Sequence, residues 1–521
     1  MFDSRVNKML EKISLKNFKS FSLLEDLEIK PITILSGANS CGKSSLLQSI
    51  LLLKQTLESQ SLNQTLLLNG RFVRLGTFGN LTFHKKTENK VELKFAFRIP
   101  KDYFFSSRRK GLLPLHIFLR ELFPPSNSSR SDRSQDNEYF ISYKVVIKNA
   151  PKQSINYQLD PVLIDEVEVF TKTMNKDETV LSESFVRANH KNGDFYELSW
   201  NNTGSRFFRL MDSGSEEIEN KGQKTVKIKY SNLFPSNISS ALDEESRHKG
   251  SSDMDAFLMF RRANDFLKTL LGSYSYIGPL REEPSRRYIY ENEVIEVGNK
   301  GENAAYIYLS ERETVIPEHY FYNSSSDSFE EEKKLKLSEA VQKWLELMNI
   351  KQFKPEPQQE IIYLNLNASK LDSTRVNIAD VGFGVSQIFP IVLEGLRMPK
   401  GSTLLLEQPE IHLHPNLQMD LADYFISLAL SGKQVIVETH SDHIINRLVR
   451  RIVEDQTSKL SQLIKIYFVD STEDGSVCEE VCIDESMGIV NWPDNFFDQV
   501  AKEQQKIMLA GLKKRKALKH K

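Results

Sequence analysis

The first hundred residues contain strand patterns followed by a helix pattern. Apolar and polar side chains alternate over residues 10–20, and residues 32–36 form a short apolar run, so both stretches predict strands. A glycine-rich loop follows, and the apolar spacing over residues 44–57 predicts a helix. Strand-like segments then continue to about residue 99. The order of strand, glycine loop and helix predicts the beginning of an α/β domain.

The middle of the chain has a different pattern. Over residues 139–235 short strand-like runs alternate with Asn, Gly and Asp turns, which predicts a β-rich insertion. Residues 253–271 and 335–348 have the apolar spacing of helices, and the polar residues 323–332 predict a loop. From about residue 361 to 500 strand and helix patterns alternate again.

These patterns predict one α/β domain whose two pieces flank an insertion. We expect residues 1–100 to form the first lobe, with the glycine loop, and residues 101–360 to form an insertion or arm. Residues 361–521 would then form the second lobe and end in a basic tail.

The composition is that of an ordinary folded protein. The 521 residues carry a formal net charge of −1, so any contact with nucleic acid needs a local basic patch rather than the whole chain. Three cysteines and no recognisable signal peptide predict a cytoplasmic protein. No apolar run approaches the roughly 18 residues of a membrane-spanning helix, so we expect no membrane association.

Residues 37–44 read GANSCGKS and match the phosphate-loop pattern GxxxxGK[ST] in full. In this motif the glycines let backbone N–H groups curl around phosphate oxygens, Lys43 reaches the β- and γ-phosphates, and Ser44 ligates Mg²⁺. The strand before it and the helix after it are the context that the motif requires. The sequence therefore predicts ATP and Mg²⁺ as ligands. The candidates that bind them are Gly37, Ala38, Asn39, Ser40, Cys41, Gly42, Lys43, Ser44 and Ser45.

Two apolar strands near the end of the chain carry polar groups at their tips. Residues 403–407 (TLLLE) place Glu407 where a Walker B acid binds the water shell of Mg²⁺. The second strand, residues 435–438, is followed by Thr-His-Ser, which contains His440. Upstream of both, a glycine-containing segment opens a helix and makes a second anion cradle. Its candidate residues are Gly382, Gly384 and Ser386.

This series of motifs resembles the ABC-type heads of SMC, RecF and OLD-family ATPases, over roughly residues 9–100 and 361–500. Residues 276–287 and 491–497 further resemble a bacterial group of stand-alone OLD-like ATPases that lack a TOPRIM nuclease domain. Several of these are associated with phage defence, and the Septu-type ATPases are similar in kind. The resemblance implies a P-loop NTPase head of ABC type, a mixed sheet flanked by helices and split by the β-rich and helical insertion.

The resemblance also implies an assembly and a set of roles. The chain would form an ATP-sandwich dimer or a higher oligomer, in which the signature of one subunit closes on the nucleotide of the other. Glu407 would take the place of the Walker B acid and ligate Mg²⁺ together with Ser44, and His440 would sense the γ-phosphate. Gly382, Gly384 and Ser386 would belong to the signature.

One departure from this pattern bears on catalysis. Related heads carry Glu directly after the Walker B acid, but here the residue is Gln408, whose amide orients water and cannot take its proton. Hydrolysis is therefore expected to be slow, or Glu410 acts as the base. The catalytic candidates are Glu407, Gln408, Glu410 and His440.

Three other groups of residues keep two interpretations. The histidines between residues 412 and 443 suggest a metal site, although the ATPase motifs account for some of them. Arg281, Arg286 and Arg287 fit either contacts with phosphate or DNA or structural ion pairs. The basic residues 513–521 fit either a nucleic-acid contact or a solvated tail.

Three functions compete. The first is an ATP-dependent sensor or scaffold that controls a separately encoded effector, such as an HNH nuclease, in phage defence. The second is a DNA-repair or SMC-like ATPase that binds DNA and acts alone; it predicts long coiled coils, which the β pattern of residues 139–235 does not favour. The third, a P-loop kinase or GTPase, does not explain the signature or the Thr-His-Ser strand end. About 80 residues follow His440, too few for a TOPRIM domain, so we expect no nuclease in this chain.

Overall fold

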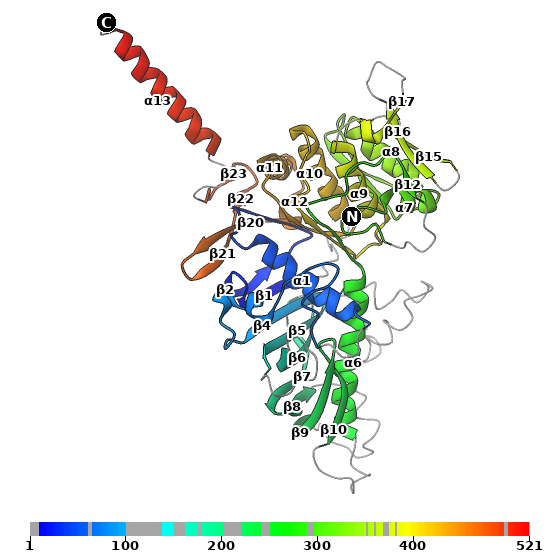
Figure 1. The fold of residues 1–521 in the computed structure, drawn as a ribbon, viewed down its shortest axis with the longest axis vertical. Coiled ribbons are helices and arrows are strands. Elements are labelled where there is room, and N and C mark those ends of the chain that lie inside the picture. Colours follow the sequence, from blue (N-terminus) through cyan, green and yellow to red (C-terminus); the bar gives the residue numbers. More distant parts are fainter. Residues whose placement is uncertain are drawn as a thin grey trace.

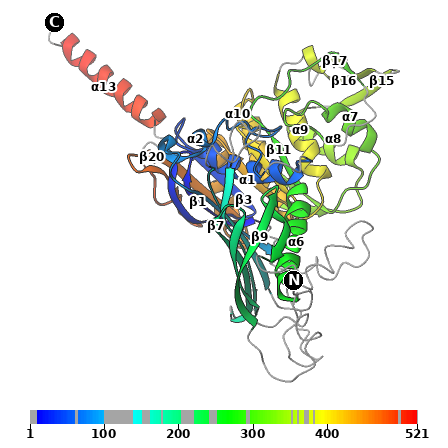
Figure 2. The same ribbon diagram turned by 60° about the horizontal axis from the view of Figure 1, so that its bottom comes forward.

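The computed structural model describes residues 10–60, 65–99, 138–150, 162–175, 177, 179–202, 220–240, 251–289, 296–350, 353–358, 361–367, 375–380, 383–493 and 499–519. Figures 1 and 2 show the arrangement of its helices and strands.

An antiparallel sheet forms one side of the molecule (Figure 1). Its strands are β1 (Leu10–Phe18), β2 (Phe21–Glu28), β4 (Val91–Ile99), β5 (Glu138–Asn149), β6 (Val162–Met174), β7 (Val180–Asn192), β8 (Phe195–Asn202), β9 (Asn220–Ser231) and β10 (Phe234–Ser240). Their order is β10-β9-β8-β7-β6-β5-β4-β1-β2, so the strands from β4 to β10 lie side by side in the order in which they occur in the sequence. The helix α6 (Ser251–Gly272) packs against β6, β7 and β10. The predicted β-rich character of the middle of the chain is confirmed.

A second sheet carries the phosphate-loop motif. Its strands are β3 (Ile32–Gly37), β11 (Tyr274–Ile277), β18 (Thr403–Glu407), β19 (Gln434–Glu438), β20 (Ile464–Thr472) and β21 (Gly475–Glu480). The order is β11-β18-β19-β3-β20-β21, and every neighbouring pair is parallel except β20 and β21. The carboxyl ends of the parallel strands gather at one edge of the sheet, where open α/β sheets bind ligands.

The parallel sheet separates two hydrophobic cores. Successive side chains of a strand point to opposite faces; in β18, Leu405 belongs to the core that includes the antiparallel sheet, whereas Leu404 and Leu406 belong to the other core. The helices that contribute to that other core include α9 (Phe383–Arg397), α10 (Pro415–Leu430) and α11 (Asp442–Glu454). The first core also contains α1 (Lys43–Glu58). The structure therefore has the predicted α/β class, with sheets flanked by helices.

Smaller elements complete the fold. Beside α9 lie α7 (Ala304–Glu311), α8 (Leu337–Leu347), η3 (Ile378–Asp380) and a small sheet of β12 (Tyr288–Ile289), β15 (Lys354–Gln358), β16 (Ile361–Asn367) and β17 (Arg375–Asn377). The remaining elements are α2 (Phe78–Leu81), η1 (Phe83–Lys85), β13 (His319–Asn323), β14 (Ser328–Glu332), α12 (Leu460–Leu463), β22 (Ile483–Asp484), β23 (Gly488–Ile489) and α13 (Gln499–Lys519).

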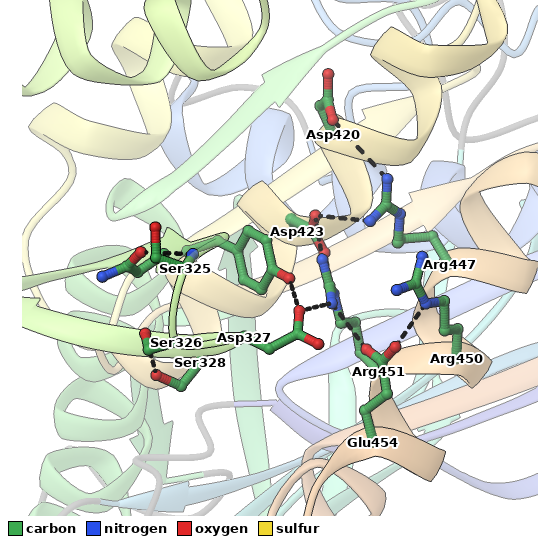
Figure 3. A network of polar contacts seen from close by, with 12 residues as sticks. Ser325, Ser326, Asp327, Ser328, Asp420, Asp423, Arg447, Arg450, Arg451 and Glu454 are labelled. Atoms are coloured by element: carbon green, nitrogen blue, oxygen red, sulfur yellow. Dashed lines mark hydrogen bonds and ion pairs between the residues drawn. The ribbon is translucent and has the colours of Figure 1, made fainter.

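The hairpin of β13 and β14 is attached to α10 and α11 by charged side chains (Figure 3). Arg451 of α11 is 3% exposed and donates to the Asp423 carboxylate of α10 over 2.8 and 3.1 Å. At the hairpin tip, Asp327 lies 3.6 Å from Arg451, whose guanidinium stacks 3.8 Å from the Tyr322 ring centre. The loop predicted for residues 323–332 is therefore wrong, because strand pairing and these anchors outweigh the polar pattern.

The boundaries expected at residues 100 and 360 stay a prediction. Residue 100 and the stretch to 137, like residues 359–360, lie outside the described residues. Two sheets extend across these positions: β5–β10 continue the sheet of β1, β2 and β4, and β11 pairs with β18 in the parallel sheet.

The helix α13 extends away from the other elements in both views (Figures 1 and 2). It includes the first part of the basic segment, and its Ile507 and Met508 side chains are exposed. Of the helices in the described residues, none combines the length and the apolar character that crossing a membrane requires.

Candidate nucleotide-binding site

The phosphate loop joins β3 to α1 and requires glycine at two positions. Gly37 and Gly42 have φ angles of 147° and 107°, which residues with a side chain rarely adopt. A Cβ atom at Gly37 would lie 2.0 Å from the Val469 carbonyl oxygen, and one at Gly42 would lie 2.4 Å from the Ser20 hydroxyl. The loop is therefore enclosed between β20 and the β1–β2 turn, at the N-terminus of α1.

Lys43 and Cys41 fold back onto the loop. The Nζ of Lys43 donates to the carbonyl oxygens of Gly37 and Ala38 over 3.1 and 2.5 Å. Cys41 is buried, and its Sγ donates to the Ala38 carbonyl oxygen over 2.9 Å. Cys41 thus stabilises the loop from inside as a free cysteine.

A cavity of about 660 Å³ opens beside the loop, a size typical of small-molecule sites. The predicted residues that line it are Asn39, Ser40, Gly42, Lys43, Ser44, Ser45, Gln408 and His440. The unpredicted ones are Lys19, Ser20, Gln48, Asn80, Thr82, His84, Lys85 and Glu438. The structure thus brings the phosphate loop, the end of β18 and the end of β19 together around one space.

Two carboxylates lie side by side at the tips of adjacent strands. Glu407 ends β18 and Glu438 ends β19, and the two are partners in the strand register. Burial raises the pKa of Glu407 to about 7, with a further contribution from the Glu438 charge, while a hydrogen bond from Tyr276 opposes the rise. Burial also raises the pKa of Glu438, whose Oε1 accepts a hydrogen bond from the Ser44 hydroxyl over 2.9 Å.

Gln408 and Glu410 occupy different places. Gln408 lines the cavity and has a left-handed φ of 45°, and its N–H donates to the Glu438 carbonyl oxygen over 2.7 Å. Glu410 is not among the residues that line the cavity. Its Oε1 accepts a hydrogen bond from the His440 N–H over 2.6 Å, and burial raises its pKa. Gln408 therefore belongs to the cavity wall, whereas Glu410 supports the backbone of the β19 end.

His440 lies between the phosphate loop and the end of β19. Its ring hydrogen-bonds the Gly37 backbone, and burial together with the Lys43 charge lowers its pKa. A neutral ring in the cavity wall can donate one hydrogen bond and accept another. The sensing of a γ-phosphate by His440 stays a prediction.

The signature residues do not reach this cavity within one chain. Gly382 lies outside the described residues. Gly384 and Ser386 are in the first turn and a half of α9, and neither lines the cavity beside the phosphate loop. Ser386 is instead among the residues around a small space next to Tyr288 and Pro390.

The segment around residue 280 supports the Walker B turn. Tyr276 hydrogen-bonds Glu407, and the buried Arg281 donates to the carbonyl oxygens of Gln408 and Pro409 over 3.0 and 3.3 Å. The exposed Arg286 pairs with Asp380 over 2.5 Å. The structure therefore favours structural hydrogen bonds and ion pairs, rather than direct contact with phosphate, for Arg281 and Arg286.

Several cavity residues have no strong sequence signal. Lys19, between β1 and β2, donates to the Gln48 side chain, and burial lowers its pKa. His84 and Lys85 both have left-handed φ angles, 53° and 59°. Such strained backbone is common at functional sites. Glu438 did have a signal, since it ends a short buried strand as Glu407 does.

The histidines after β18 do not form a metal site of their own. His414 caps α10 by accepting from the Asn416 N–H over 3.3 Å, and His443 lies 3.7 Å from Asp442. In the part of the chain that the structure describes, no group of three or more His, Cys, Asp or Glu side chains is arranged to hold a metal ion. Mg²⁺ bound with a nucleotide needs fewer protein ligands, because phosphates and water complete its shell. The oxygen donors Ser44 and Glu438, which line the cavity, fit that requirement, whereas the predicted ligand Glu407 is not among the residues that line it.

Two family models match parts of the chain. A family model described as AAA ATPase domain matches residues 9–445, which is most of the chain. A second model, described as a protein of unknown function (DUF3696), matches residues 461–507. No curated protein matches the chain.

Solved structures similar to the chain include heads of SMC proteins. A structure of the Smc head bound to the C-winged-helix domain of ScpA is 12% identical, with a TM-score of 0.36, and covers 92% of this chain and 100% of its own. The SMC head domain from Thermotoga maritima is 9% identical, with a TM-score of 0.32, and covers 91% and 100%. A Pyrococcus furiosus Smc head with an extended coiled coil, bound to the C-terminal domain of ScpA, is 12% identical, with a TM-score of 0.36, and covers 92% of this chain and 98% of its own.

Proposed function

Because the chain belongs to the family described as AAA ATPase domain, we propose that it binds ATP with Mg²⁺ beside the phosphate loop and hydrolyses it slowly. The cavity of about 660 Å³ that joins Lys43, Ser44, Gln408 and His440 carries this proposal. Lys43 and the N-terminus of α1 would hold the phosphates, and Ser44 and a carboxylate at the strand tips would hold Mg²⁺, which neutralises charge on the phosphates. Gln408 would orient the attacking water.

The hydrogen-bonding capacity of the site supports slow turnover. An amide at Gln408 can hold water by donating and accepting hydrogen bonds, but it has no basic group of useful pKa. Glu410, the other candidate, is engaged by the His440 N–H and lies outside the cavity wall. ATP would then act mainly as a signal for assembly.

We further propose that the chain is an OLD-like, ABC-type sensor or scaffold that controls a separately encoded effector, such as an HNH nuclease in phage defence. The resemblance of residues 276–287 supports this. So does the insertion, because its described part includes the strands β5–β10 and has no pair of long helices. A DNA-repair or SMC-like ATPase acting alone is the alternative. Loss of phage resistance on deleting the chain or its neighbouring effector gene, but unchanged survival of DNA damage, would separate the two.

ATP binding by two lysine variants tests the central proposal. Lys43→Ala should abolish ATP binding measured by calorimetry and leave the fold intact. Lys54→Ala is the matched control: Lys54 lies in the same helix and is as buried, but it donates to the Leu271 carbonyl oxygen, away from the cavity. Equal ATP affinity in wild type and Lys43→Ala would refute the assignment.

A further inference from the structure

Glu438 is a buried carboxylate that the phosphate-loop motif does not explain. It is 3% exposed and lines the cavity from the end of β19. Its Oε1 accepts the hydrogen bond from Ser44, whereas its Oε2 has no hydrogen-bond partner. The nearby Lys43 favours the ionised form by its charge, but its Nζ donates to Gly37 and Ala38.

A buried carboxylate oxygen without a partner is costly, and proteins almost always supply a donor or a cation to it. Because Glu438 lines the cavity, a ligand that enters the cavity can supply the partner that its Oε2 lacks. A divalent cation beside a polyphosphate is the partner that also suits the Ser44 hydroxyl, the Mg²⁺ ligand of the motif.

The spacing of the two oxygens fits such a cation. Mg²⁺ binds six oxygens at about 2.0–2.1 Å in a near-ideal octahedron, so two adjacent ligand oxygens lie about 2.9 Å apart. The Ser44 Oγ and the Glu438 Oε1 are 2.9 Å apart. This distance is the length of their hydrogen bond, and it holds the Ser44 hydroxyl and the Glu438 carboxylate side by side.

We propose that Glu438 is the protein carboxylate that ligates the Mg²⁺ of bound Mg·ATP beside Ser44. This inference rests on the proposed ATP-binding function and deepens it. Glu407, the acid expected from the Walker B pattern, accepts a hydrogen bond from Tyr276 and does not line the cavity. Glu438 is its partner in the strand register.

A purely structural role for Glu438 makes a different prediction. In that case its carboxylate only accepts the Ser44 hydrogen bond and stabilises the N-terminus of α1. Glu438→Gln separates the two roles, because an amide oxygen still accepts the hydrogen bond but ligates Mg²⁺ poorly.

ATP affinity of the full chain, measured by calorimetry first in EDTA and then across a Mg²⁺ titration, tests the proposal. We expect Glu438→Gln to bind ATP in EDTA as the wild type does and to need about tenfold or more Mg²⁺ for the half-maximal gain in affinity. The EPR spectrum of Mn²⁺ added with ATP should change in the same variant. Glu394→Gln is the matched control, since Glu394 is also buried and does not line the cavity.

The outcomes are distinct. An unchanged Mg²⁺ requirement in Glu438→Gln, or a raised requirement in Glu407→Gln alone, would overturn the inference and leave ATP binding standing. No ATP binding by the wild type in either condition would remove the proposed function and this inference with it. If Glu438→Gln does not fold, Glu438→Asp serves instead, because it retracts the carboxylate by one methylene and should also raise the Mg²⁺ requirement.

Discussion

Gln408 and Glu410 are the two candidates for handling the attacking water, and the structure gives them different surroundings. Gln408 lines the cavity, whereas Glu410 is bonded to the His440 backbone. A carboxylate at position 408 could take the water's proton, and general-base catalysis contributes roughly 10²–10⁴-fold. We therefore expect Gln408→Glu to raise the steady-state rate of ATP hydrolysis about tenfold or more.

Glu410→Gln should change the steady-state rate of ATP hydrolysis little, because its amide oxygen still accepts the hydrogen bond from the His440 N–H. The opposite result, with activity lost in Glu410→Gln and unchanged in Gln408→Glu, would identify Glu410 as the base.

The pKa of Glu407 predicts a pH dependence of stability. Burial raises it to about 7, above the value of about 4.3 in an unfolded chain. The folded state thus favours the protonated carboxyl group. The contribution of Glu407 to the free energy of unfolding is therefore complete below about pH 4.3 and is lost as pH rises through 7. We expect the melting temperature of ligand-free wild type, relative to Glu407→Gln, to fall between pH 5 and pH 8. A difference that stays constant over this range would contradict the assignment.

The part of the site that consists of local motifs could be predicted from the sequence. The part that depends on tertiary contacts could not. The phosphate loop could be located because its glycines, Lys43 and Ser44 are consecutive. Lys19 and Arg281 act through contacts with residues far away in the sequence, which no local pattern reveals. The role of Glu438 depends on β19 lying next to β3, and that order comes from the sheet.

At the scale of secondary structure elements, the β13–β14 hairpin depends on the ion pairs beneath it. Asp423 and Arg451 are both almost completely buried. Removing one partner of a buried pair leaves an uncompensated charge and typically costs about 3–5 kcal/mol. We expect Asp423→Asn to lower the free energy of unfolding by roughly that amount in urea titrations.

Asp327 provides the matched control for that variant. Its side chain is exposed at the hairpin tip, so Asp327→Asn should have a much smaller effect on the free energy of unfolding. Equal losses in the two variants would show that burial of the pair is not what stabilises the hairpin.

Elements whose apolar residues recur with a clear period could be predicted from the sequence. Elements that are stabilised mainly by tertiary contacts could not. The apolar spacing of α1 and the short apolar strands β18 and β19 agree with the sequence patterns. The hairpin was missed because its strands carry serine and glutamate. Its pairing is supported by contacts such as that of Tyr322 with Phe329, whose ring centres are 5.4 Å apart.

At the scale of the whole molecule, the separation of the signature from the phosphate loop predicts assembly. Gly384 does not line the cavity of its own chain, so a second chain would have to supply it. We expect ATP with Mg²⁺ to convert the protein to a dimer or a higher oligomer in light scattering. Gly384→Glu should block this and retain ATP binding, since a Cβ there meets no atom closer than 3.7 Å. A wild type that stays monomeric with ATP would contradict the sandwich arrangement.

The position of β3 in the parallel sheet has a consequence for the time course of synthesis. The strand that precedes the phosphate loop lies between β19 and β20, and the Gln434 side chain bonds to Leu10, 424 positions away. A ribosome that adds about 5–20 residues per second needs roughly 20 to 90 s to proceed from Leu10 to Gln434. During that interval β1, β2 and β4 can pair, but β3 has both edges exposed, a state prone to aggregation. The growing chain therefore cannot use ATP to stabilise its first half, and it needs protection until the last strands of the sheet have been made.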